Sequence, residues 1–197
     1  MKFAGDIISY VAILVIIVSL GSLGMQITGH STVTDEAIVN VTVSSSAAIN
    51  FTVDLVEFGT GSVNNGTLGS TLETGQTPIG GTWSAEPAAL TLENIGNVNL
   101  TLNISASEAA DDYLGGKDPL FQYKVTDAAS NTGACVGNGA SAYKNFTTTA
   151  ASAVLACNPL QFDDDKDEID VNIKLYIPSD SVTGTHTATI TATGTYS

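Results

Sequence analysis

Two kinds of hydrophobic pattern divide this chain. Between Ile7 and Ile27 the sequence is continuously apolar, and no Asp, Glu, Lys or Arg occurs from residue 7 to residue 34. After residue 36, apolar and polar residues alternate with a period of two, which is typical of β-strands that bury one face. The pattern therefore predicts an N-terminal helix at residues 1–30 and a β-domain at residues 36–197.

The alternation in the second part predicts about seven short strands. Asn94, Gly96 and Asn97 provide turn residues that we expect to join two of these strands in a hairpin. No amphipathic helix pattern follows residue 36. An all-β fold is expected, an antiparallel β-sandwich with Ig-like or jelly-roll topology. The predicted strands cover residues 39–43, 49–55, 90–92, 98–104, 121–125, 169–177 and 188–192.

The apolar segment is long enough to cross a bilayer, since 21 helical residues rise roughly 30 Å. Lys2 precedes it and Asp35 and Glu36 follow it, so the positive-inside rule places the N-terminus in the cytoplasm and the β-domain outside. A transmembrane anchor or a filament-core helix is the favoured interpretation. A cleaved secretory signal is the alternative, although no A-x-A cleavage site follows the apolar run.

A pilin-type helix is one form of the filament-core hypothesis. Residues 1–5 would then be a removed leader, and Asp6 would be the first mature residue. Its carboxylate could pair with the N-terminal amine of a neighbouring subunit. Asp6 can equally be a helix N-terminal carboxylate at a membrane interface, where the helix dipole favours it.

Charge narrows the range of partners. The chain has 6 Lys, no Arg and 20 Asp plus Glu, with a net charge of −14. Nucleic acid and anionic lipid surfaces are therefore not expected as partners. The abundance of Thr, Ser, Gly, Asn and Val is typical of strand-rich exported domains, which agrees with a location at the cell surface.

The two cysteines, Cys135 and Cys157, flank a loop-rich part of the predicted extracellular domain. An intradomain disulfide is the economical interpretation of such a pair. A reactive thiol or a zinc site has less support, because neither His30 nor His186 lies near either cysteine in the sequence.

Six Asn-x-Ser/Thr sequons make the chain a candidate glycoprotein. Several of them fall on the polar phase of a predicted strand, where a glycan would point to solvent. Ordinary exposed asparagines in a chain rich in Ser and Thr are the alternative. The candidate asparagines are Asn40, Asn50, Asn65, Asn99, Asn103 and Asn145.

An acidic run precedes the strand predicted at residues 169–177. Crowded carboxylates repel one another unless a cation bridges them, and oxygen ligands on a loop suit Ca²⁺. The spacing does not match an EF-hand, and a solvated acidic loop is the simpler alternative. The candidate ligands are Asp163, Asp164, Asp165, Asp167 and Glu168.

No catalytic motif is found in the sequence. It has no Gly-x-Ser-x-Gly elbow, no His-Glu-x-x-His and no phosphate-binding glycine loop. A pair of acidic residues could serve a glycosidase. Such sites need aromatic-lined clefts, however, and the β-domain has a single tryptophan, Trp83. The protein is therefore not expected to be an enzyme.

Several short motifs resemble those of uncharacterised archaeal cell-surface and pilin-like proteins, notably of the small-genome lineages. The motifs are Val18-Ser19-Leu20-Gly21, Phe58-Gly59, the segment from Asn94 to Val98, Ile177-Pro178 and the segment from Thr183 to Thr185. The resemblance implies a surface or filament-subunit role, similar to archaeal pilins or donor-strand-assembled fibre proteins. It brings no catalytic residue.

Together these patterns predict a structural cell-surface protein, a pilus-like filament subunit whose N-terminal helix mediates assembly or anchoring. Its expected partners are further copies of itself and the membrane. The alternative is a membrane-anchored adhesin, or a β-sandwich module that binds carbohydrate or Ca²⁺.

Overall fold

The computed structural model describes residues 38–148 and 153–196. The predicted N-terminal helix, with Asp6, Ile7 and Ile27, lies outside the described residues. A boundary between two units falls between Val43 and Ser44. Within the described residues the one helix has five residues, so no helix there is long and apolar enough to span a membrane.

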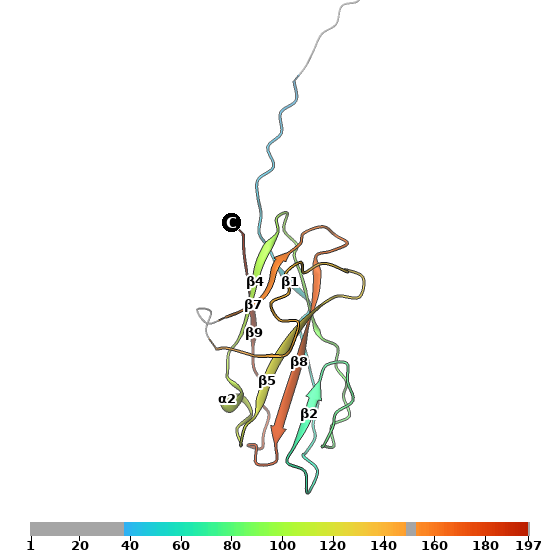
Figure 1. Ribbon diagram of the computed structural model, residues 1–197, viewed down its shortest axis with the longest axis vertical. Helices are drawn as coiled ribbons and strands as arrows, with labels where there is room; N and C mark the ends of the chain where they lie inside the picture. Colours follow the sequence, from blue (N-terminus) through green and yellow to red (C-terminus); the bar gives the residue numbers. More distant parts are fainter. Residues whose placement is uncertain (1–37, 149–152, 197) are drawn as a thin grey trace, which may run out of the picture. The chain divides into compact units, whose positions relative to one another are not determined.

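Residues 44–196 fold into antiparallel β-sheets, as predicted (Figure 1). A short helix that the sequence did not predict, α2, lies between β4 and β5. The elements are β1 (Asn50–Val53), β2 (Gly69–Glu73), β3 (Leu90–Glu93), β4 (Leu100–Ala106), α2 (Ala110–Leu114), β5 (Leu120–Asp127), β6 (Lys144–Asn145), β7 (Val154–Leu160), β8 (Glu168–Pro178) and β9 (Ile190–Thr195).

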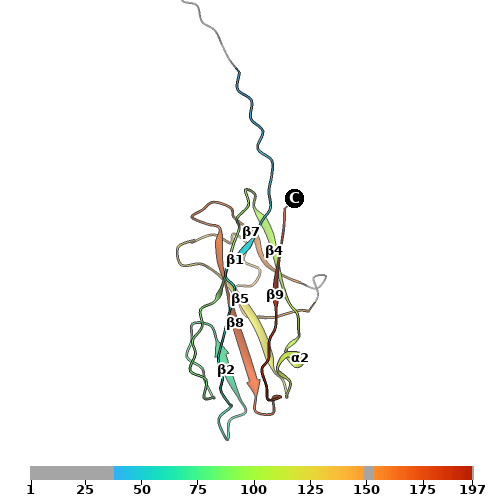
Figure 2. The same cartoon turned by 180° about the vertical axis from the view of Figure 1, so that it is seen from behind.

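The larger sheet has six strands and is organised around β8. Its order is β1-β3-β8-β5-β6, and β2 pairs with the C-terminal half of β8 beyond the end of β3. β5 pairs with β8 along its whole length, from Leu120 opposite Tyr176 to Asp127 opposite Ile169. The smaller sheet has the order β7-β4-β9 (Figure 2).

One hydrophobic core joins the two sheets, because every second residue of the long strands points inward. β8 contributes Ile169, Val171, Ile173 and Leu175 from the larger sheet. The smaller sheet contributes to the same cluster from β4 and β7, and its residues are Leu102, Ile104, Ala106, Ala156, Cys157 and Leu160. Burying this apolar surface is the main force that stabilises the fold.

Two of the predicted local structures are wrong. Residues 39–43 form no strand. The predicted hairpin across residues 94–97 is also wrong, because β3 lies in the larger sheet and β4 in the smaller. The predicted strand at 49–55 is present but shorter, with an irregular register between Phe51 and Val53.

Asn94 explains why β3 and β4 separate. Its side-chain amide is buried and donates hydrogen bonds to the carbonyls of Val98 (2.9 Å) and Gln161 (3.0 Å). Its side-chain oxygen accepts a bond from the backbone N–H of Gly96 (3.1 Å). The turn is thus fastened to the chain that follows β7, and β4 leaves in the direction of the smaller sheet.

Candidate functional site

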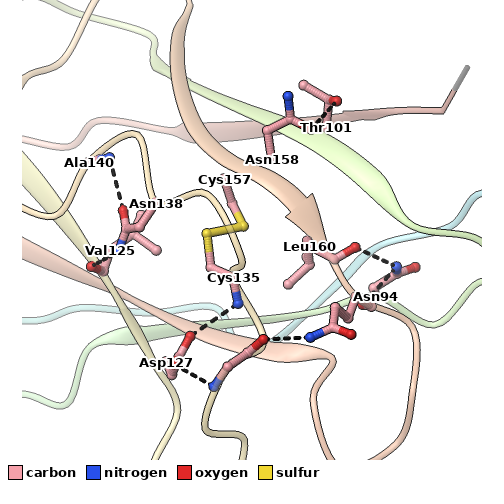
Figure 3. Close-up of a disulfide and its surroundings, with 12 residues drawn as sticks. Asn94, Thr101, Val125, Asp127, Cys135, Asn138, Ala140, Cys157, Asn158 and Leu160 are labelled. Atoms are coloured by element: carbon pink, nitrogen blue, oxygen red, sulfur yellow. Dashed lines mark hydrogen bonds between the residues drawn. A yellow bond between two sulfur atoms is a disulfide. The ribbon is translucent and has the colours of Figure 1, made fainter.

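The predicted disulfide between Cys135 and Cys157 is present, with the two Cα atoms 5.5 Å apart (Figure 3). Cys157 is fully buried on β7, and Cys135 lies on the loop that follows β5. The bond therefore fixes that loop to the smaller sheet.

Two polar side chains hold the same loop against β5. The Asp127 carboxylate accepts bonds from the backbone N–H groups of Gly133 (2.7 Å) and Cys135 (3.1 Å). The Asn138 amide donates to the carbonyl of Val125 (2.8 Å), and its oxygen accepts a bond from the N–H of Ala140 (2.9 Å). Figure 3 shows Asp127 and Asn138 beside the disulfide.

The fastened loop also covers the outer edge of β7. Cys135 forms an isolated bridge with Leu160, and Asn138 forms one with Cys157. A backbone bond from the N–H of Gly139 to the carbonyl of Ala156 (3.0 Å) extends this contact. The outer edge of β7 is therefore not available for another strand.

The predicted calcium ligands do not gather around one point. Asp163, Asp164 and Asp165 are exposed, whereas Asp167 is buried. Glu168 lies at the start of β8 and accepts a hydrogen bond from the amide of Asn131 (3.0 Å). In the part of the chain that the structure describes, no three metal-ligating side chains form a group that could hold an ion. Calcium binding by this run stays a prediction.

Burial and neighbouring negative charges raise the pKa values of two carboxyl groups in this region. Burial raises the pKa of Asp167, and the negative charges of Asp164, Asp165 and Asp163 raise it further, while a backbone N–H bond opposes them. The negative charges of these carboxylates therefore repel one another.

The pKa of Glu93, at the end of β3, is also raised by burial and by the charges of the acidic run. Burial raises its pKa first, followed by the charges of Asp167, Glu168 and Asp164. In the β3–β8 register Glu93 lies opposite Glu168, and like charges in that arrangement destabilise a sheet.

All six sequon asparagines lie in the described residues. Five of them are exposed, namely Asn40, Asn50, Asn65, Asn99 and Asn145, and Asn103 is half-buried on the outward phase of β4. The side chain of Asn145 already accepts a hydrogen bond from the Gln122 amide (2.9 Å). Their glycosylation stays a prediction.

A polar cluster that the sequence did not predict lies on the outer face of the larger sheet. The Tyr143 hydroxyl donates to a carboxylate oxygen of Glu73 (2.5 Å). The Nζ atoms of Lys124 and Lys174 lie 4.9 and 5.0 Å from the centre of the Tyr143 ring. Lys174 also forms an ion pair with Glu73 (3.6 Å). Alternation placed the two lysines on this face, but nothing in the sequence indicated that Tyr143 would lie beside them.

The polar groups of the cluster pair with one another through a hydrogen bond, an ion pair and cation–π contacts. Burial raises the pKa of Tyr143, and its hydrogen bond to Glu73 and the charge of Glu73 raise it further. The ring therefore stays neutral at physiological pH, and the two ammonium groups gain cation–π contacts. This arrangement ties β2, β5 and β8 to the loop before β6.

Among residues 38–148 and 153–196, the cysteines and the histidine are engaged in contacts within the domain. Both cysteines are in the disulfide. His186, the one histidine there, has its Nε2 atom 2.8 Å from the carbonyl oxygen of Val182. A depression of about 360 Å³ at the end of β4 and β9 is lined by small polar and apolar groups, among them Ser45, Thr101 and Thr195.

Comparison with known proteins adds no relative. The chain matches no protein-family model, no curated protein and no solved structure.

Proposed function

We propose that this chain is a structural protein of the cell surface, a subunit of a pilus-like filament. The carrying observation is the segment between the apolar N-terminal stretch and the β-domain. Its large apolar side chains are almost fully exposed to water, at 85% for Ile38, 90% for Val39, 84% for Val41 and 78% for Val43. Exposed apolar residues that lie together are typical of an interaction site, so they support self-association.

The β-domain is suited to such a role. It is held by one disulfide and carries a net charge that keeps an exported protein soluble. A two-sheet domain of this kind can form the outer layer of a filament while the apolar stretch from Ile7 to Ile27 forms the core or an anchor. The choice between Ig-like and jelly-roll topology stays a prediction.

The filament hypothesis also predicts on which side of the membrane each part of the chain would lie. The segment preceding Asp6 would lie in the cytoplasm before processing, and residues after 36 would lie outside the cell. Mass spectrometry of the native protein distinguishes the forms, because removal of residues 1–5 leaves Asp6 as the first residue. An intact Met1 would exclude both the processed pilin and the cleaved signal.

Negative-stain electron microscopy of the full-length protein, after removal of detergent, tests the filament directly. We expect regular fibres whose repeat is constant between preparations. A matched variant with Ile16→Lys places a charge in the centre of the apolar stretch and should abolish them, whereas Ile16→Val should not.

A uniform population of monomers in place of fibres would contradict the filament and favour the anchored binding module. That alternative has its own readout. Calcium calorimetry and retention on a glycan array, both with the full-length protein in detergent, would then have to give binding.

A further inference from the structure

One outer strand of the smaller sheet, β9, has a free outer edge. In the order β7-β4-β9, β7 is covered by the disulfide loop, while β9 pairs only with β4. The six-residue register of β9 runs without a bulge from Ile190 opposite Ala106 to Thr195 opposite Thr101. Such an edge presents unpaired N–H and C=O groups, which can receive another strand.

The other outer strands of the described domain are poorer acceptors. β6 has only two residues. β1 has four, and its register is broken between Phe51 and Val53. β2 is bridged on its other side, where Thr71 pairs with Ile79. The free edge of β9 is therefore the longest regular edge in the part of the chain that the structure describes.

The core beside β9 is incompletely covered. The inward-facing residues of β9, Ile190, Ala192 and Gly194, are only half-buried, in contrast to the fully buried inward residues of β4 such as Leu102 and Ile104. The side chain of Ile49, just before β1, approaches the same flank, since a Cβ atom on Gly194 would lie 3.4 Å from it. A further strand along β9 would bury this apolar flank, and each buried side chain would contribute favourably.

Residues 38–43 have the properties of the missing strand. Val39, Val41 and Val43 alternate with Asn40 and Thr42, and valine and threonine are strong β-formers. Six extended residues span roughly 20 Å, which is the length of the six residues of β9. The structure gives this segment no strand partner, as its residues have no assigned pairing.

We propose that residues 38–43 of one copy pair with the free edge of β9 in a second copy. Val39, Val41 and Val43 would face the half-buried flank, and Asn40 and Thr42 would face outward beside the exposed threonines of β9. Because each chain carries both the donor segment and the acceptor edge, the contact is heterologous and repeats from copy to copy. The inference rests on the proposed filament, for which it names the subunit contact.

Cysteine cross-linking in the full-length protein tests the pairing. One sample carries Asn40→Cys or Thr42→Cys, and the other carries Thr191→Cys or Thr193→Cys; the four mixtures are oxidised and run on a non-reducing gel. A strand pair brings the Cα atoms of facing residues within disulfide distance. We expect at least one mixture to give a linked heterodimer about tenfold above a control mixture that contains Asn65→Cys, a residue exposed in a loop.

Proline substitution provides the second measurement. Val41→Pro removes a backbone N–H from the donor segment and should reduce cross-linking about tenfold, whereas Val41→Thr keeps the backbone donor and the β-propensity and should not. Residue 41 precedes the unit that begins at Ser44, so the thermal unfolding of the β-domain should be the same in both variants. That readout excludes a folding defect as the cause.

The outcomes separate the contact from the filament. Fibres without any cross-link to β9 would overturn the strand pairing and leave the filament intact. Linked dimers without fibres would overturn the filament and leave the strand pairing. A further sample carries one donor cysteine and one acceptor cysteine in the same chain. Disulfides that form only within single copies of this double variant, with none in the mixtures, would show that the segment pairs with its own β9, which overturns the proposed exchange between copies.

Discussion

The side-chain amide of Asn94 lies 2.9 Å from the carbonyl oxygen of Val98, at the point where the chain passes from one sheet to the other. Asn94 is 1% exposed, so water cannot replace these bonds. It also donates to Gln161 beyond β7, and its own N–H donates to the carbonyl of Asp167 (2.9 Å). One buried asparagine thus joins the ends of β3, β7 and the acidic loop.

Asn94→Ala should therefore destabilise the domain by about 2 kcal/mol, because it leaves buried carbonyl groups without donors. Chemical denaturation followed by circular dichroism measures the change. The matched control is Asn64→Ala, at an exposed turn position, which should change the free energy of unfolding by less than about 0.5 kcal/mol. Equal effects of the two substitutions would show that Asn94 does not hold the crossing.

The role of Asp127 can be tested by amide hydrogen exchange, which is measured at single residues. Its carboxylate accepts bonds from the N–H groups of Gly133 and Cys135. Asp127→Ala removes both acceptors, so these two amides should exchange with solvent at least tenfold faster, and stability should fall by about 2 kcal/mol. Asp127→Asn keeps one acceptor oxygen and should give a smaller change. Unchanged exchange in Asp127→Ala would mean that the disulfide alone fixes the loop.

Loss of the disulfide should weaken the domain more than loss of these hydrogen bonds. Cys135 and Cys157 are 22 residues apart, and cross-linking a loop of that size stabilises a fold by about 3 kcal/mol in the chain-entropy model. The Cys135→Ser/Cys157→Ser double variant should show this loss in urea denaturation. Reductant should destabilise the wild type by the same amount and leave the double variant unaffected. A reductant effect on the double variant would indicate another cause.

Alternation of apolar and polar residues identified the long strands because almost every inward-facing position in them is apolar. β8 buries every second residue from Ile169 to Leu175, and β5 buries Phe121, Tyr123 and Val125. A period of two indicates that one face of a strand is buried, and this prediction is confirmed for β5 and β8. β2, β6 and β7 were not located. Gly69–Glu73 and Lys144–Asn145 lie in stretches rich in small polar residues, and the buried residues of Val154–Leu160 do not alternate regularly.

The same pattern does not reveal which strand pairs with which. Residues 94–97 have turn composition, but the buried contacts of Asn94 send β4 to the other sheet. Residues 39–43 alternate as strongly as a strand, yet the structure assigns them no strand. The sequence also did not reveal that the candidate calcium ligands differ in burial: Asp163, Asp164 and Asp165 are exposed, whereas Asp167 is buried. Calcium binding stays a prediction.

Mild acid should stabilise the domain, in contrast to the usual loss of stability. The folded-state pKa values of Glu93 and Asp167 lie above the ordinary values of these groups, 4.5 and 3.8. At pH values between the ordinary and the folded-state pKa, the folded state therefore binds more protons at these two groups than the unfolded state does. Linkage then requires the free energy of unfolding to rise as the pH falls through this window, and these two groups destabilise the fold above it.

A thermal unfolding series from pH 7 to pH 4.5 tests this sign. Little opposing loss is expected, because the one ion pair among the described residues joins Glu73 and Lys174 at the surface. Glu93→Gln/Asp167→Asn should raise the unfolding temperature at pH 7 and flatten its pH dependence, since both charges are absent at every pH. Addition of 0.5 M salt should have a similar but smaller effect at pH 7 through screening. A double variant whose unfolding temperature still rises as the pH falls, as in the wild type, or is lower than the wild type at pH 7, would show that these carboxylates do not carry the repulsion.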